Sequence, residues 1–141
     1  MPLVKVNLLE GRSAAEKEAI GAAVQAALVE NLGVPDEDLY QIFNELSSDN
    51  FRHTDGYLGL TYTRQLLIIE ITFLVGRSDD VKKALLADIN RNLVTAGVVS
   101  PVASTSRSPY SIHAATATRL TTPNGSIAFQ ARAISWSKRN R

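Results

Sequence analysis

Apolar and polar residues alternate at the start of the chain, and the pattern becomes helical after Gly11. Residues 3–9 place Val4, Val6 and Leu8 on one face, which predicts a strand with one buried side. Apolar side chains then recur at helical spacing over residues 14–32. Gly33, with Pro35 shortly after it, is a typical helix end. The pattern therefore predicts a strand followed by a helix.

The same order of elements appears again later in the chain. Residues 66–75 form a dense apolar, β-branched run, which predicts a strand covered on both faces. A helical pattern follows Ser78 and ends before Gly97. Between the two pairs, residues 38–46 predict a further strand, and residues 49–63 predict a loop that contains a short hairpin or an extension.

The two strand–helix pairs are related as an internal repeat. Residues 8–20 read LLEGRSAAEKEAI and residues 73–85 read FLVGRSDDVKKAL. Ser13 with Glu16 predicts a capping box, and Ser78 predicts the second helix start. Two β-α-β units with parallel strands and right-handed crossovers are then expected. The predicted fold class is α/β: a four-stranded mixed sheet backed by two helices, as a two-layer sandwich.

The last third of the chain breaks this pattern. Residues 1–100 carry fourteen acidic and nine basic side chains, whereas residues 101–141 carry six basic and none that are acidic. Serine, threonine and alanine dominate there, and Pro101 and Pro109 interrupt any strand. We therefore predict a domain over 1–100, with an incomplete second repeat, and an atypical basic arm or tail over 101–141. An ordered arm against another subunit, a floppy tail and a reading-frame shift near residue 98 all remain open.

Composition narrows the classes of function. The chain has no cysteine, which excludes disulfides, thiolate metal sites and cysteine nucleophiles. His53 and His113 have no partner at ligand spacing, so no metal site is predicted. We see no signal peptide or membrane-length apolar run and expect a cytoplasmic protein without membrane contact. The basic end 138–141 is more typical of a solvated tail than of nucleic-acid binding.

Pro2 is the first candidate for chemistry. A small second residue permits removal of the initiator methionine, which would leave proline as a free secondary amine. An α-amino group titrates at about 7.7–8.0 in model peptides, and burial lowers this further. Such a group suits general acid–base catalysis near neutral pH. The plain alternative is an inert Met-Pro start.

Two arginines and two residues at the start of the predicted strand 38–46 could complete a site. Arg12 and Arg77 each lie between a strand end and a helix start, where anions bind, and guanidinium groups clamp carboxylates. Surface capping or pairing is the alternative for both. Asp38 and Tyr40 are two apart on the predicted strand and could face one pocket. Alternatively, Asp38 belongs to a solvated acidic loop and Tyr40 is a core aromatic.

Over residues 2–97 the chain resembles the tautomerase superfamily. The resemblance is carried by Pro2, the LLEGRS turn, Gly33-Val34-Pro35, the segment 38–41 and the second Gly-Arg-Ser. The branch that includes malonate semialdehyde decarboxylase is the most similar. The resemblance implies a homotrimer and a catalytic terminal proline without a cofactor. It also implies that Pro2 moves a proton or polarises a carbonyl, that Arg77 binds the substrate carboxylate, that Asp38 assists, and that Arg12 binds substrate.

The chain departs from the decarboxylase at two places. Leu74 and Val75 stand near the position of a second arginine, and a Trp-Ser-Phe-Gly segment is missing; both count against decarboxylation or hydration. The predicted function is an isomerase or lyase acting on small 2-oxo, enol or unsaturated carboxylates through Pro2, Asp38 and Arg77, with Arg12 and Tyr40 binding substrate. The alternatives are a non-catalytic trimeric binding or structural protein and, more weakly, a basic tail that binds a polyanion.

Overall fold

The structure is a computed structural model that describes residues 2–57, 60–74, 76–99 and 126–133, with 56–57, 60–61 and 126–133 described by their backbone alone. Its elements in chain order are β1 (Leu3–Leu9), α1 (Ala14–Leu32), β2 (Gln41–Leu46), β3 (Gly56–Tyr57), β4 (Leu60–Thr61), β5 (Leu67–Leu74), α2 (Asp79–Thr95) and β6 (Ser126–Ala133). The predicted strands at 3–9 and 66–75, both helices and the hairpin in the loop are confirmed.

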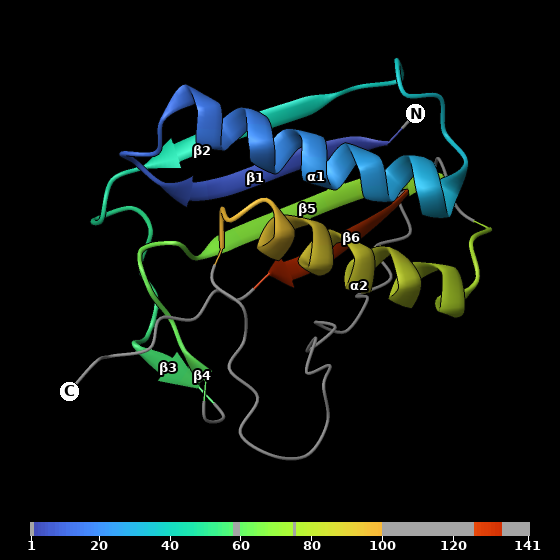
Figure 1. The fold of residues 1–141 in the computed structure, drawn as a ribbon. Helices are drawn as coiled ribbons and strands as arrows, with labels where there is room; N and C mark the ends of the chain where they lie inside the picture. The colour runs from blue at the N-terminus through green and yellow to red at the C-terminus, as the bar shows by residue number, and fades with distance from the viewer. Residues whose placement is uncertain (1, 58–59, 75, 100–125, 134–141) are drawn as a thin grey trace.

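The main sheet has the strand order β2-β1-β5-β6 (Figure 1). β1 and β2 are parallel and β1 and β5 are antiparallel, so the sheet is mixed as predicted. β6 runs antiparallel to β5, so the second half of the chain does not repeat the parallel pairing of the first. The predicted arm over 101–141 otherwise lies outside the described residues.

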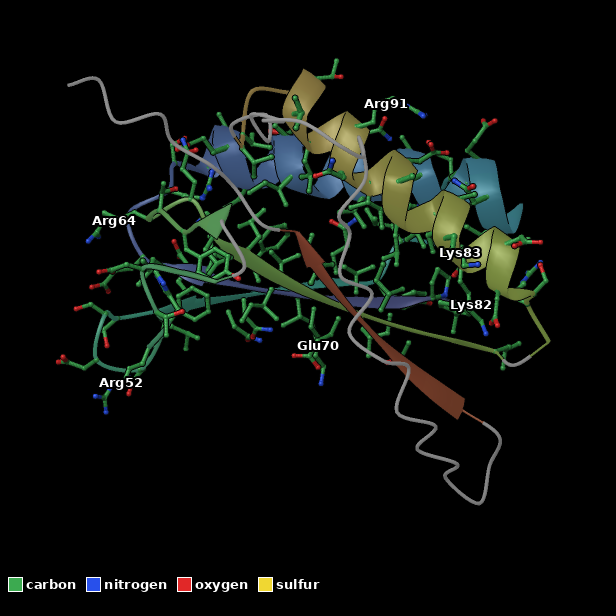
Figure 2. All side chains as sticks on the ribbon, turned by 90° about the horizontal axis from the view of Figure 1, so that it is seen from below. Arg52, Arg64, Glu70, Lys82, Lys83 and Arg91 are labelled. Carbon is green, nitrogen blue, oxygen red and sulfur yellow. The ribbon has the colours of Figure 1, made fainter. Side chains whose placement is uncertain are left out.

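Both helices pack on one side of the sheet, and no described helix covers the other side (Figure 2). Alternate strand residues face the helices and are fully buried, together with apolar side chains of α1 and α2. The largest of them are Val4, Val6, Leu8, Ile20, Val24, Leu28, Leu67, Ile69, Ile71, Leu85, Ile89 and Leu93. Each such side chain stabilises the fold by about 1.5–3 kcal/mol relative to exposure.

The prediction that the strand at 66–75 is covered on both faces is not met within one chain. Buried and half-buried residues alternate along β5, and its last residue, Leu74, is exposed. On the open face, Asn44 donates to Asn7 at 2.9 Å, and Asn7 donates to Glu70 at 3.0 Å. A row of polar side chains across β2, β1 and β5 therefore occupies part of this face. The apolar run of β5 in the sequence gives no sign of this row.

Helix boundaries follow the predicted caps. Ser13 accepts a hydrogen bond from the Glu16 backbone N–H, and Glu16 completes the capping box. Gly33 ends α1 at φ 64°, a left-handed conformation that glycine adopts without a Cβ clash. Ser78 caps α2 by accepting from the Val81 N–H at 3.3 Å. Among the described residues, no helix is long and apolar enough to cross a membrane.

Candidate functional site

One end of the sheet brings together most of the residues predicted to carry chemistry. β1 and β2 begin at this end, and β5 finishes there (Figure 1). Val4 lies opposite Gln41 at the start of β2, and Leu3 lies opposite Thr72 near the end of β5. The chain therefore places Pro2, the residues before β2, and Arg77 after β5 at the same sheet edge.

Pro2 is buried directly ahead of β1. Its ring precedes a strand held on both sides, and the Val4 N–H donates to the Tyr40 carbonyl at 2.9 Å. A terminal nitrogen at residue 2 would therefore sit on rigid backbone, partly shielded from water. Burial of this kind favours the neutral form of an amine, which is the form that can accept a proton.

Arg77 is exposed between the end of β5 and the N-cap of α2 at Ser78. Within the described ranges, its guanidinium takes part in no hydrogen bond or ion pair. The helix N-terminus beside it adds positive partial charge. Arg77 is thus a cation with uncommitted donors at the Pro2 end of the sheet, suited to bind a carboxylate in two-point fashion.

Asp38 and Tyr40 reach the same edge, but not as strand residues. The strand β2 begins only at Gln41, because the Asp38 N–H donates to the Pro35 carbonyl at 3.0 Å and closes a turn. The predicted strand start at residue 38 is therefore wrong, and alternation does not place these two side chains on one face. Asp38 is half-buried, and Tyr40 is 49% exposed rather than a core aromatic.

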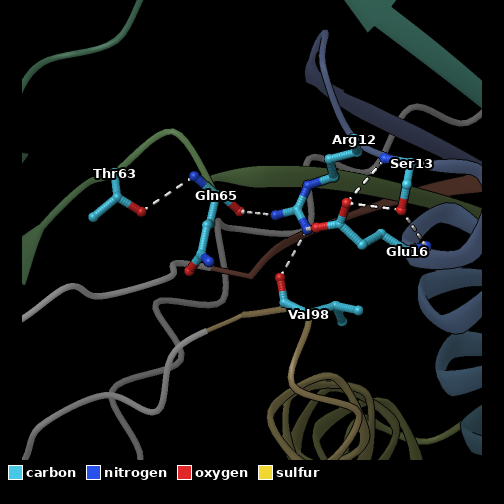
Figure 3. Close-up of polar contacts among 6 residues, drawn as sticks. All are labelled: Arg12, Ser13, Glu16, Thr63, Gln65 and Val98. Carbon is cyan, nitrogen blue, oxygen red and sulfur yellow. Dashed lines mark hydrogen bonds and ion pairs between the residues drawn. The ribbon is translucent and has the colours of Figure 1, made fainter.

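Arg12 lies at the opposite end of the sheet from Pro2. β1 and β5 are antiparallel, so the two Gly-Arg-Ser turns that follow them point to opposite ends. The Arg12 guanidinium donates to the Val98 carbonyl at 2.9 Å and to the Gln65 carbonyl at 3.0 Å (Figure 3). Its side chain is only 8% exposed and also pairs with Glu16 at 3.5 Å.

These contacts give Arg12 a structural role in this chain. The guanidinium ties the turn before α1 to the segment that leads into β5 and to the segment that follows α2, and these three segments are far apart in sequence. Burial lowers the pKa of Arg12, and the carboxylate of Glu16 opposes that shift. Within one chain the structure does not bring Arg12 and Pro2 together, because Arg12 donates to carbonyls at the opposite end of the sheet. A substrate-binding role of Arg12 stays a prediction.

The capping box beside Arg12 should make stability depend on pH. Hydrogen bonds from the Ser13 backbone and side chain, and the charge of Arg12, hold the pKa of Glu16 below its ordinary value. A lowered folded-state pKa contributes stability above the ordinary carboxyl pKa, and this is lost as pH falls through the folded-state value. Glu16→Gln should therefore lower the thermal midpoint at pH 7, and the gap to the parent should narrow below pH 4.5.

Calorimetry of both proteins across the acid range measures this effect. Glu18→Gln is the matched control, because Glu18 is exposed on the same helix and lies outside the capping box. A gap that stays constant from pH 7 into the acid range would show that the ionised Glu16 does not stabilise the helix start.

Comparison with known proteins decides the family. Two models of tautomerase enzymes match the chain, one over residues 2–60 and one over residues 38–101. The structure is similar to malonate semialdehyde decarboxylase inhibited by 3-bromopropiolate, with 30% identity and a TM-score of 0.59 over 67% of this chain and 72% of that one. The chain belongs to the tautomerase family.

Two further relatives support the assignment. A probable tautomerase of Bacillus subtilis (strain 168), YusQ, is 28% identical over 63% of this chain and 70% of its own length. A fused 4-OT that forms an asymmetric trimer is 25% identical, with a TM-score of 0.54 over 70% of this chain and 76% of that chain. The tautomerase models start at Pro2 and end at Pro101, so they cover both ends of the sheet.

Sequence reasoning missed some residues at the Pro2 end of this tautomerase fold. Leu39, Ile42 and Leu74 are large apolar side chains that stay exposed there. Only Leu74 could have been noticed in the sequence, because it is an apolar residue at the very end of a predicted strand. A separate groove of about 430 Å³ runs between α1 and β2. Leu39 and Gln41 line it, but Pro2 and Arg77 do not.

No cluster of metal-ligating groups appears within the described part of this tautomerase. Among those residues, no three histidine, aspartate or glutamate side chains gather into a possible metal site. His53 instead contacts the Thr54 carbonyl at 2.9 Å and lies edge-on to Phe51 and Tyr62. His113 lies outside the described residues.

Proposed function

We propose that this tautomerase-family chain is a cofactor-independent acid–base enzyme acting on small 2-oxo, enol or unsaturated carboxylates through Pro2. The observation that carries the proposal is the strand register. It brings the start of β1, with Pro2, beside the exit of β5 that leads to Arg77. A basic nitrogen and an uncommitted cation at one sheet edge are the two groups that tautomerisation of a carboxylate requires.

The proposed reaction moves a proton without any redox change. The neutral nitrogen of a terminal Pro2 accepts the proton of the enol hydroxyl while the carbon–oxygen double bond forms. The protonated nitrogen then donates a proton to the neighbouring carbon, which completes the keto form. Arg77 holds the carboxylate, and Asp38 orients the substrate or a water molecule. Tyr40 borders the bound substrate.

Within the family, we place the chain in the branch of malonate semialdehyde decarboxylase. Two structures of that enzyme are similar to this one, with TM-scores of 0.59 and 0.61. We propose isomerase chemistry ahead of lyase chemistry, because Leu74 supplies no charge next to Arg77. A homotrimer is supported by the trimeric fused 4-OT among the similar structures. A cytoplasmic location remains a prediction.

A non-catalytic trimeric binding or structural protein is the second candidate. Met1 precedes Pro2 in the sequence, and a proline in peptide linkage has no basic nitrogen. If the methionine is retained in the working protein, proton transfer by Pro2 is impossible, and the fold would serve as a scaffold.

Turnover of phenylenolpyruvate, followed by loss of its enol absorbance, separates the two candidates. The protein's intact mass, measured on the same preparation, shows whether Met1 has been removed. The enzyme proposal predicts a mass without methionine, with catalysed ketonisation faster than the buffer reaction. Processed, trimeric protein that does not accelerate ketonisation would instead support the scaffold.

A further inference from the structure

The segment between α1 and β2, residues 34–40, carries Asp38 but is not fixed by packing. None of its side chains is buried, and Val34 is the residue of the segment that packs against the core. The groove of about 430 Å³ opens between α1 and β2, and Asp36 and Leu39 of the segment line it. Because apolar burial does not hold these residues in place, their position depends on hydrogen bonds.

Gln25 supplies one of these hydrogen bonds from α1. Its side-chain Nε2 donates to the Asp36 carbonyl at 3.1 Å. Gln25 is only 7% exposed, and within the described part of the chain it is the one polar side chain that is buried. A buried carboxamide costs free energy unless it is hydrogen-bonded. An apolar side chain would fill this position on α1 without that cost, so the contact with Asp36 is what the carboxamide adds.

Asp38 lies between two backbone carbonyls that are each held from another element. Two residues before it, the Asp36 carbonyl is held to α1 by Gln25. Two residues after it, the Tyr40 carbonyl accepts from the Val4 N–H of β1 at 2.9 Å. The position of Asp38 relative to β1, and hence relative to the proline that precedes β1, therefore depends on both contacts.

We infer that Gln25 is a positioning residue, which fixes the turn at Asp36 and so holds Asp38 in place at the Pro2 end of the sheet. This inference rests on the proposed function, because it assigns a support to Asp38 in the same site. Gln25 itself lies on α1 and acts on the reaction only through the backbone that carries Asp38. Loss of the contact should therefore lower kcat, whereas KM, which depends on Arg77, should change little.

Amide hydrogen exchange measures the positioning without requiring turnover. Gln25→Met removes the donor but keeps a long side chain and a good helix former. On the full, processed protein, the Asp38 N–H should then exchange at least about tenfold faster by NMR, because its turn loses the contact at Asp36. The Gly33 N–H, which donates to the Val29 carbonyl at the end of α1, is the internal reference and should keep the parent rate.

Asn92→Leu is the matched control. Asn92 on α2 also donates from its carboxamide to a backbone carbonyl of α1, that of Ala23, at 3.1 Å. Its replacement removes the same kind of hydrogen bond from the same helix but leaves the hydrogen bond between Gln25 and Asp36 in place. Exchange at Asp38 should therefore stay at the parent rate in Asn92→Leu.

Turnover of phenylenolpyruvate tests whether Gln25 acts through Asp38. Gln25→Met should lower kcat by about tenfold in the parent but by less than about twofold in an Asp38→Asn background, with KM nearly unchanged in both. Asn92→Leu should leave kcat unchanged. If Gln25→Met does not fold, Gln25→Asn, whose carboxamide sits on a side chain one methylene shorter, should give the same results.

Two results would overturn the inference. The first is unchanged exchange at Asp38 in the folded Gln25 variant. The second is a kcat that falls equally in the parent and in the Asp38→Asn background, or in neither, which would show that Gln25 serves the fold alone. If the processed parent does not turn over phenylenolpyruvate, the proposed function fails, and the exchange rates still decide whether Gln25 holds the turn.

Discussion

Pro2→Ala should lower kcat/KM for phenylenolpyruvate by about 10²–10⁴-fold, the range that general acid–base groups contribute. The substitution removes the ring that fixes the nitrogen ahead of β1 and replaces a secondary amine with a more mobile primary one. The fold should be unaffected, because residue 2 precedes the first strand and the β1 core residues Val4, Val6 and Leu8 are unchanged. Steady-state kinetics, with sedimentation to confirm the assembly, measures this effect.

A second variant separates the nitrogen from the ring. Insertion of a glycine between Met1 and Pro2 keeps the proline ring. After methionine is removed, the proline nitrogen is still in an amide bond, to the inserted glycine, and is not a free amine. This protein should be as inactive as Pro2→Ala and as stable as the parent. Turnover that persists in both variants would exclude Pro2 from the mechanism.

The two Gly-Arg-Ser arginines should give opposite results when each is replaced by glutamine. Arg77→Gln should lower kcat/KM by about 10–100-fold, mainly through KM, because it removes a charge-assisted contact worth about 1.5–3 kcal/mol. Its thermal midpoint should not change, since Arg77 has no hydrogen bond or ion pair among the described residues. Kinetics and calorimetry on the same preparation measure both quantities.

Arg12→Gln should instead destabilise the fold by about 2–4 kcal/mol. The substitution leaves the carbonyls of Val98 and Gln65 without the charged donors that reach them at 2.9 and 3.0 Å. Below its melting temperature the variant should keep kcat/KM within about threefold of the parent. A folded Arg12→Gln protein with strongly reduced turnover would restore the substrate-binding role that the sequence predicts for this residue.

Local sequence signals account for β1, β5 and the two helices, but not for the start of β2 or for β6. Alternation predicts β1, and Ser13, Glu16, Gly33 and Ser78 predict the helix ends, because each of these signals acts within one or two turns of chain. The strand β2 begins at Gln41 and not at the predicted residue 38, because a hydrogen bond from the Asp38 N–H to the Pro35 carbonyl closes a turn there. The acidic residues of that turn gave no indication of this hydrogen bond.

The parts of the site that could not be predicted depend on long-range pairing. Two similar turns look equivalent in sequence, but the antiparallel pairing of β1 and β5 sends Arg12 and Arg77 to opposite ends of the sheet. The partners of Arg12, at Gln65 and Val98, lie on other elements and act through backbone carbonyls, which no residue type reveals.

The resemblance to the tautomerase superfamily supplied what the residues alone left open. A Met-Pro start and an isolated arginine are each ordinary, and neither indicates an active site by itself. The two family models, one of which begins at Pro2, confirm the family. The structure adds that Pro2 is buried at the sheet edge where β5 ends and leads to Arg77. The roles of Pro2, Asp38 and Arg77 remain proposals.

A pH titration of the Pro2 nitrogen by ¹⁵N NMR tests the central claim most directly. The account predicts a resonance that titrates as a single free amine, with a midpoint below the ordinary α-amino value of about 7.7–8.0, because burial disfavours the cation. A resonance with the shift of an amide and no titration between about pH 6 and 10 would contradict the account, because Pro2 would then have no proton to exchange.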